Sequence, residues 1–350
     1  MCAEPLHEDA PLRFIVKNYP SYRQSFPDPI VKPESSLQPP YPEPLEVTKN
    51  EHLGLEEQLH RKGVSVVFDP FAHQLSDKNS HLPIDKAFDL WRSRNPSGDL
   101  RSFLTSKLPF DFPTIDCRVC RQRGTLGTSF SPIYIMGSEK DSKSTGLSAT
   151  FISSRKNSTK NSSKYSIFER RNEDEIVGIL TSNFVGSEFL LQEAKSDANL
   201  YSSDVSPDLM AVFFSTLAET TTTKGPREIR VALRTDNSRN FSIFDFGKIC
   251  NESPVEDIKS TRSAILLKNK APKFNAHLNA FVLNFNKRVL KASIKNFQLI
   301  DATDSDERRI IYQFGKVGKD DFNVDFSWPF SPMEAFACAL TAFDFKICCD

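Results

Sequence analysis

Residues 331–346 read SPMEAFACALTAFDFK, and this stretch decides the fold class. Ser331 is an N-cap, Pro332 stands at the first helical position where its missing N–H costs nothing, and Glu334 completes a capping box. The helix that begins there has apolar side chains all round, at Ala335, Phe336, Ala337, Cys338, Ala339, Leu340, Ala342 and Phe343. Such a helix must be surrounded, and because it is too short to span a bilayer, its surroundings should be protein.

Short strands precede this helix, starting from about residue 110. REIRVAL (227–233) and FNVDFSW (322–328) alternate apolar with polar side chains, which is typical of half-buried strands. RVLKASIK (288–295) alternates in the same way, and its phase slips at Asn296, which predicts a bulge or bend in a curved sheet. The use of 29 phenylalanines against 13 glycines also favours aromatic-rich strands. The sequence therefore predicts a mainly β fold, a barrel with the C-terminal helix threaded through its middle.

The N-terminal part of the chain has a different texture. Residues 18–46 are rich in proline, which restricts its neighbours to extended conformations and predicts a linker or disordered arm. TKNEHLGLEEQLHRKG (48–63) and IDKAFDLWRSRN around Trp91 predict short helices, which either dock a partner or fold back on the domain; we favour folding back. We therefore divide the chain into a largely disordered arm, residues 1–109, and a domain, residues 110–350, and expect protein partners to bind the arm.

Composition excludes several classes of function. Lysine plus arginine equal aspartate plus glutamate at 45 each, so the chain lacks the basic excess of a dedicated nucleic-acid binder, and we predict no specific nucleic acid partner. Seven scattered cysteines are typical of reduced thiols in the cytosol or nucleus. The start MCAEPLHEDA has acidic residues where a secretory signal would have basic ones, so we expect a cytoplasmic protein.

The sequence offers no constellation for catalysis or for a cofactor. Its six histidines are dispersed, and the H-E-x-x-H, G-x-S-x-G and P-loop spacings are missing, so we predict no catalytic residues and no enzyme. Cys117 and Cys120 have a C-x-x-C spacing, but no second pair follows at a zinc-finger distance. We favour two cysteines of a strand in a reduced core over a metal site, and predict neither metal nor cofactor.

Long segments of the chain closely resemble the tubby-like protein family. NKAPKFNAHLNAFVLNFNKRVLKASIKNFQLI (269–300), QFGKVGKDDFNVDFSWPF (313–330) and EAFACALTAFDFKICCD (334–350) resemble its two signature segments and its terminus. The resemblance extends back through KGPREIRVAL and SRKNSTKNSSKYSIF to IDCRVCR, so it covers residues 112–350. It implies a tubby C-terminal domain, a closed antiparallel barrel of twelve strands around a central helix, with a non-enzymatic role. Lys287 stands where the family usually has glycine, and Leu290 where it has serine or threonine.

The resemblance also implies a ligand, the headgroup of phosphatidylinositol 4,5-bisphosphate, which holds family members at the plasma membrane. A multiply phosphorylated ring needs lysine and arginine donors. The family supplies them from a Lys-x-Arg pair in a strand and from a third arginine. The corresponding residues of this sequence are Ile179, Thr181 and Ser206, so all three cations of the lipid clamp are predicted to be lost.

A basic hairpin could replace part of that charge. SRKNSTKNSSKYSIFERR (154–171) carries the candidate patch Arg155, Lys156, Lys160 and Lys164. Such a loop either associates with an anionic membrane surface or is a hairpin that its charges keep soluble. We favour an adaptor in the cytoplasm, peripheral to the plasma membrane. The alternatives are a protein-interaction scaffold without lipid binding and a nuclear transcriptional regulator, with the nucleus or a cilium as other locations.

Overall fold

The computed structural model describes only part of the chain. The described residues are 66–68, 81–123, 131–139, 147–158, 162–170, 172, 174–194, 207–216, 227–235, 241–252, 263–275, 280–304, 307 and 309–344. The chain divides into two compact units, residues 1–47 and 48–350, and every described residue belongs to the second unit. The predicted helix over 48–63, the proline-rich segment 18–46, Lys160 and Ser206 lie outside the described residues.

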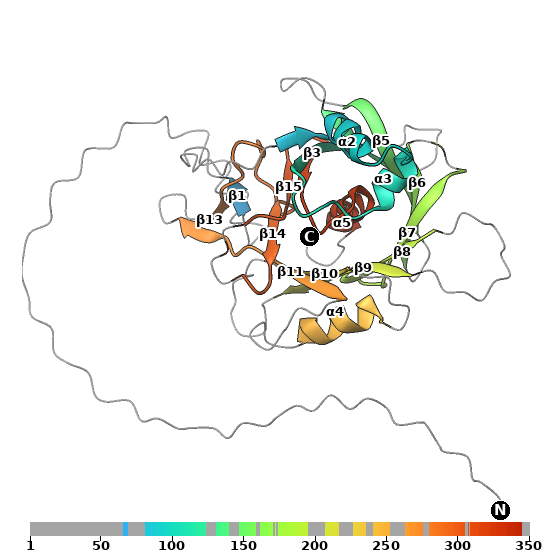
Figure 1. The fold of residues 1–350 in the computed structure, drawn as a ribbon. Coiled ribbons are helices and arrows are strands. Elements are labelled where there is room, and N and C mark those ends of the chain that lie inside the picture. The colour runs from blue at the N-terminus through green and yellow to red at the C-terminus, as the bar shows by residue number, and fades with distance from the viewer. Residues whose placement is uncertain are drawn as a thin grey trace, which may run out of the picture. The chain divides into compact units, whose positions relative to one another are not determined.

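Twelve of the described strands form one closed antiparallel barrel (Figure 1). They are β3 (Thr114–Gln122), β4 (Ile133–Glu139), β5 (Leu147–Ser158), β6 (Ser163–Glu169), β7 (Ile176–Ser182), β8 (Glu188–Glu193), β9 (Asp208–Thr216), β10 (Arg227–Arg234), β11 (Ala264–Asn269), β14 (Phe297–Asp301), β15 (Tyr312–Lys316) and β16 (Asp321–Phe326). The ring closes where β16 pairs with β3, with Val324 opposite Cys117. The predicted twelve-stranded barrel is confirmed, and so are the strands expected over 227–233 and 322–328.

Four further described strands are not part of the ring. β2 (His81–Pro83) runs parallel to β3 and extends the sheet at its N-terminal half. A separate small sheet contains β1 (Val66–Phe68), β12 (Lys273–Asn275) and β13 (Ala280–Leu283).

Helix α5 (Pro332–Asp344) runs through the middle of the strand ring, as Figure 1 shows. Its capping box forms as predicted: the Ser331 N–H donates to Glu334 Oε2 at 2.8 Å, and the Glu334 N–H donates to Ser331 Oγ at 3.2 Å. All its residues except Phe343 are buried, and most of its apolar side chains form one cluster with inward side chains of the strands. Burial of each large apolar side chain contributes about 1.5–3 kcal/mol, so a helix that is apolar all round stabilises this fold only from inside the barrel.

Two helices precede the barrel and share its core. α2 (Ile84–Arg94) confirms the helix predicted around Trp91, and it folds back on the domain, since the Trp91 ring lies 5.6 Å from that of Phe103 in α3 (Leu100–Thr105). Side chains of both helices belong to the apolar cluster around α5. Among the described residues, the packed core therefore begins at Ile84, before the boundary predicted at residue 110.

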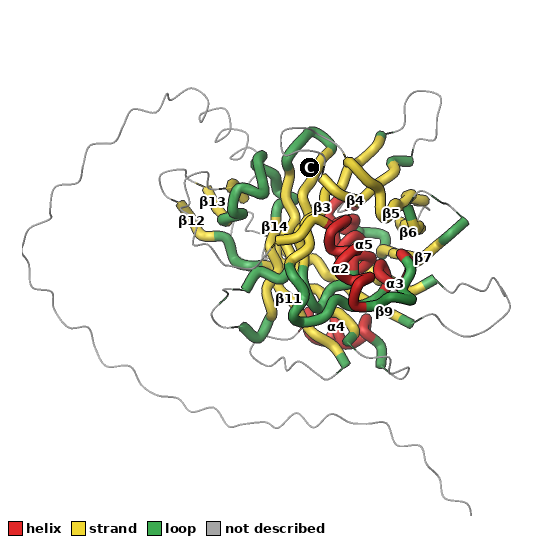
Figure 2. The backbone as a smooth tube through the Cα atoms, turned by 45° about the horizontal axis from the view of Figure 1, so that its top comes forward, coloured by secondary structure: helices red, strands yellow, loops and turns green. Residues whose placement is uncertain are grey.

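Helix α4 (Ile243–Glu252) covers the outer face of β9 and β10, and Figure 2 shows it outside the ring of strands. It buries Ile243 against Phe213 and Ala232, which point away from α5. No described helix is both long enough and apolar enough to cross a membrane.

The strand predicted over 288–295 is wrong. This segment has no regular structure, and β14 begins only at Phe297. The backbone turns at Asn286 and Lys287, whose φ angles are 48° and 64°, and neither fits a strand. Tertiary contacts of this segment override its alternating pattern, and as a result Leu290 is 56% exposed instead of facing a core.

Candidate functional site

Strand β7 carries, on the outer face of the barrel, two of the positions that the family resemblance predicted to correspond to the lipid clamp. Ile179 and Thr181 are half-buried and alternate with the buried Leu180 and Ser182. Gly178 sets the strand close to the central helix: a Cβ there would lie 2.8 Å from Met333 Sδ, so a larger residue would require the Met333 side chain or β7 to shift.

On one side of β7, the described residues of β8 and β9 in the row of Ile179 carry no cation, and the next strand, β10, brings Arg234 to the Asp208 carbonyl. Ile179 lies opposite Gln192 of β8, which in turn lies opposite Asp208 of β9. Gln192 Nε2 donates to Asp208 Oδ1 at 3.0 Å, and Thr181 Oγ1 donates to the Leu190 carbonyl at 3.4 Å. A carboxylate in this row opposes the binding of a phosphate.

The basic hairpin on the other side of β7 is β5 and β6, as predicted. Lys164 lies opposite Thr181 and is exposed, while Arg155 lies one strand further, across Ser166 from Ile179. Two strand spacings amount to about 10 Å, so Arg155 and Ile179 share a face without being neighbours. The structure therefore brings two of the four predicted basic residues to the outer face near β7.

Lys156 does not join that patch, because its side chain points the other way. Its ammonium group pairs with the carboxylate of Asp344, the last residue of α5, and lies 5.4 Å from the centre of the Tyr165 ring. The Asp344 side chain is fully buried and also accepts hydrogen bonds from Ser163 and Ser182, both at 3.2 Å. Lys156 thus ties the hairpin to the end of the central helix.

The turn between β7 and β8 is a feature that the sequence reasoning missed. Asn183 Oδ1 accepts the backbone N–H groups of Gly186 at 2.8 Å, Ser187 at 2.9 Å and Glu188 at 3.3 Å. Gly186 has a φ of 76°, which favours glycine. The turn is held from within, and it leaves Phe184 65% exposed. An Asn followed three residues later by Gly was the available signal for a turn, but exposure of the phenylalanine could not be read from it.

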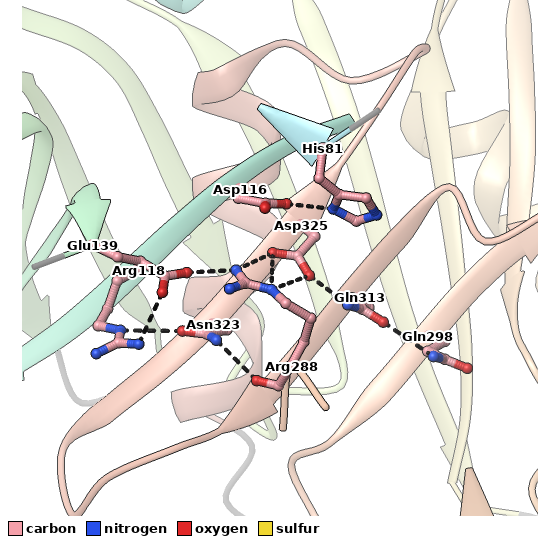
Figure 3. A network of polar contacts seen from close by, with 9 residues as sticks. All are labelled: His81, Asp116, Arg118, Glu139, Arg288, Gln298, Gln313, Asn323 and Asp325. Atoms are coloured by element: carbon pink, nitrogen blue, oxygen red, sulfur yellow. Dashed lines mark hydrogen bonds and ion pairs between the residues drawn. The ribbon is translucent and has the colours of Figure 1, made fainter. Parts of the chain in front are cut away.

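A second polar cluster fills the outer face between β3, β4 and β14–β16 (Figure 3). Arg288 lies at its centre, where it donates a hydrogen bond to Asp325 Oδ1 and forms an ion pair with Glu139 Oε1, both at 2.5 Å. Gln313 donates to Asp325, and Gln298 Nε2 donates to Gln313 Oε1 at 3.1 Å. Burial raises the pKa of Asp325, and Arg288 opposes that rise. This cluster is what draws residues 284–296 onto the barrel.

Three members of this region could in principle hold a metal ion. One ligand atom from each of His81, Asp116 and Asp325 lies within 4.8 Å of the others. However, His81 Nδ1 already lies 2.7 Å from Asp116 Oδ1, and both Asp325 oxygens accept from the Arg288 guanidinium. A fixed positive charge on that carboxylate disfavours a cation, so the arrangement is better suited to ion pairs than to a metal.

The C-x-x-C pair lies on β3. Cys117 is buried, and Cys120 Sγ lies 2.9 Å from Asp321 Oδ1. Burial, followed by the hydrogen bond to Asp321, raises the pKa of Cys120 to about 12, which keeps the thiol protonated. A protonated thiol is a poor metal ligand.

The closed twelve-stranded barrel around a buried helix is the architecture of the tubby C-terminal domain. The chain belongs to the Tub family, whose model matches residues 104–345. It is 33% identical over 250 residues to Protein king tubby of Drosophila grimshawi and 32% identical over 248 residues to Protein king tubby of Drosophila virilis. These matches cover 67% of this chain and 52% and 51% of the two relatives, so the chain spans about half the length of the curated relatives it matches.

Proposed function

We propose that this chain is a non-enzymatic tubby-like adaptor that keeps the barrel but has lost the basic clamp for the phosphatidylinositol 4,5-bisphosphate headgroup. The observation that carries the proposal is the neutral pair Ile179 and Thr181 on the outer face of β7. A charge-assisted hydrogen bond contributes about 1.5–3 kcal/mol, so two missing cations cost about 3–6 kcal/mol of headgroup binding.

The neighbours of that pair support the loss of the clamp. The row through Ile179 continues into Gln192 and Asp208. Lys156, the inward cation of the hairpin, is engaged by Asp344. Arg155 and Lys164 still lie on the outer face, and their charge supports weak peripheral association with any anionic membrane. We keep the expectations that the adaptor works in the cytoplasm and that protein partners bind its N-terminal arm.

Sedimentation with vesicles tests the proposal. One set contains phosphatidylserine, and a second set contains phosphatidylinositol 4,5-bisphosphate at matched surface charge. The full chain should pellet equally with both. Clear preference for the bisphosphate vesicles would overturn the proposal.

A gain of function checks the same reasoning. The double variant Ile179→Lys with Thr181→Arg should create the preference for the bisphosphate. Its matched control, Ile249→Lys with Asn251→Arg, adds equal charge on α4 and should create no preference for the bisphosphate.

A further inference from the structure

We propose that the end of the barrel at which α5 terminates is a membrane-docking face, in which Phe184 and Leu290 enter an anionic lipid surface within a rim of lysines. The inference rests on the proposed peripheral membrane association. It does not use the β7 clamp positions, and it requires negative surface charge instead of a particular headgroup.

Both apolar side chains lie at the same end of the barrel. The last residue of β7, Ser182, donates to Asp344 at the end of α5, and the turn that carries Phe184 follows at once. On the other side, the ring of Phe343 lies 4.9 Å from that of Phe322, which pairs with Lys316.

The segment with Leu290 is fixed to that same level. The backbone N–H groups of Leu290 and Lys291 donate to the Lys316 carbonyl at 3.2 and 3.0 Å. Lys295, four residues further along, donates from Nζ to the Ala342 carbonyl at 2.8 Å, in the last turn of α5. Leu290 is therefore held by backbone contacts while its side chain stays exposed.

Exposed apolar side chains alone do not identify this end as a docking face, because single exposed apolar residues are common on protein surfaces. The large exposed apolar residues among those the structure describes are Phe110, Phe184, Ile249 and Leu290. Phe110 packs on the Trp328 ring at 5.1 Å, near the start of α5, and Ile249 lies on α4 at the side. Phe184 and Leu290 share the end where α5 terminates.

Charge distinguishes this end further. Three of its lysines are exposed and a fourth is half-buried: Lys164, Lys291, Lys319 and Lys316. Within the described residues, none of these ammonium groups lies within ion-pair distance of a carboxylate.

Two of the nearby acidic residues are already engaged. Asp320 pairs with Arg121 at 2.6 Å and with Arg123 at 3.1 Å, and Asp321 accepts from Cys120. Glu188, at the start of β8, also lies at this end, but the lysines still leave an excess of positive charge around the two apolar side chains.

This combination fits an anionic bilayer. Apolar groups enter the acyl boundary while long lysine side chains keep their ammonium groups at headgroup level. Each lysine near an anionic leaflet contributes about fivefold to the binding constant, and that attraction falls off within a Debye length. An acidic protein would also attract the lysines but would not require burial of Phe184 and Leu290 in lipid.

Vesicle sedimentation of the full chain tests the docking face by comparing substitutions on this face with substitutions elsewhere on the barrel. Vesicles of phosphatidylcholine with phosphatidylserine are compared with vesicles of phosphatidylcholine alone. We expect pelleting with the mixed vesicles only, with release at high salt. Leu290→Ser should weaken it about tenfold, and Lys291→Glu at least fivefold.

The matched controls are Ile249→Ser and Lys248→Glu, an exposed apolar and basic pair on α4. They should leave pelleting unchanged. Equal losses from the α4 variants, or no pelleting with phosphatidylserine vesicles, would overturn the inference. Preference for the bisphosphate lipid would instead overturn the proposed function, so the two failures are distinguishable.

Insertion is tested by fluorescence. Phe184→Trp and Leu290→Trp should each shift tryptophan emission to the blue when mixed vesicles are added, and Ile249→Trp should not. Binding without a shift at Phe184→Trp and Leu290→Trp would mean that the lysines act alone, and would refute insertion.

Discussion

Because the Lys156 side chain points into the barrel, we predict that it stabilises the fold. The sequence had instead predicted that Lys156 belongs to a basic surface patch. Its partner Asp344 is fully buried, and the Lys156 side chain is 17% exposed. Removing one member of a buried pair costs about 3–5 kcal/mol because the other charge is left uncompensated. Since Lys156 retains some contact with water, we expect Lys156→Met to lower the free energy of unfolding by about 3 kcal/mol.

A second substitution should recover much of this loss. Replacement of a whole buried pair by apolar groups is often close to neutral. In Lys156→Met with Asp344→Leu, however, Ser163 and Ser182 lose their shared acceptor, so we expect the double variant to stay about 1–2 kcal/mol below the wild type.

Urea unfolding followed by circular dichroism measures these differences. The control is Lys164→Met, on the same hairpin but exposed, which should change stability by less than about 0.5 kcal/mol while weakening vesicle binding. A Lys156→Met variant within about 1 kcal/mol of the wild type would refute the reasoning, and so would a double variant as unstable as Lys156→Met alone.

Three other predictions concern backbone conformation, pH and the β7–β8 turn. Lys287→Gly should raise the free energy of unfolding by about 1 kcal/mol, because φ is 64° at this residue. The control Lys291→Gly should lower it. If urea unfolding shows that Lys287→Gly is less stable than the wild type, the prediction is wrong. The hydrogen bond to Asp116 raises the pKa of His81 against the effect of burial, so its contribution to stability is present below the unfolded pKa of about 6.5 and is lost as pH rises through the higher folded pKa. Stability measured against pH should therefore fall over this range in the wild type but stay flatter in His81→Gln, and identical profiles would rule the contribution out. Asn183→Ala removes the acceptor of three backbone N–H groups and should cost about 1–3 kcal/mol, with faster hydrogen exchange at Gly186 and Ser187; unchanged exchange would show that the turn is held otherwise.

The sequence was most informative where a pattern of side chains is compatible with only one structural environment. The capping box at Ser331 and the apolar side chains on every face of residues 335–343 required a surrounded helix, and that determined the barrel. Strands β10 and β16 followed from alternation because their two faces differ in burial.

Alternation failed at residues 288–295 because tertiary contacts decide that segment. Arg288 is drawn to Asp325 and Glu139, which lie far away in the sequence. A short stretch of alternating side chains carries no information about such partners. The same failure concealed Leu290, which the pattern placed in a core.

The strands that carry the candidate residues could be predicted, but the direction of their side chains could not. The family resemblance located Ile179 and Thr181, and the hairpin was visible from its charges. Whether Arg155 or Lys156 faces outward depends on the register of β5 against β6, and a shift of one residue reverses every side chain.

The most direct test of the account is isothermal titration calorimetry, in which the full chain is titrated with the soluble headgroup inositol 1,4,5-trisphosphate. The loss of the clamp predicts no saturable heat for the wild type and clear binding for Ile179→Lys with Thr181→Arg. Saturable, stoichiometric binding by the wild type would contradict the central claim.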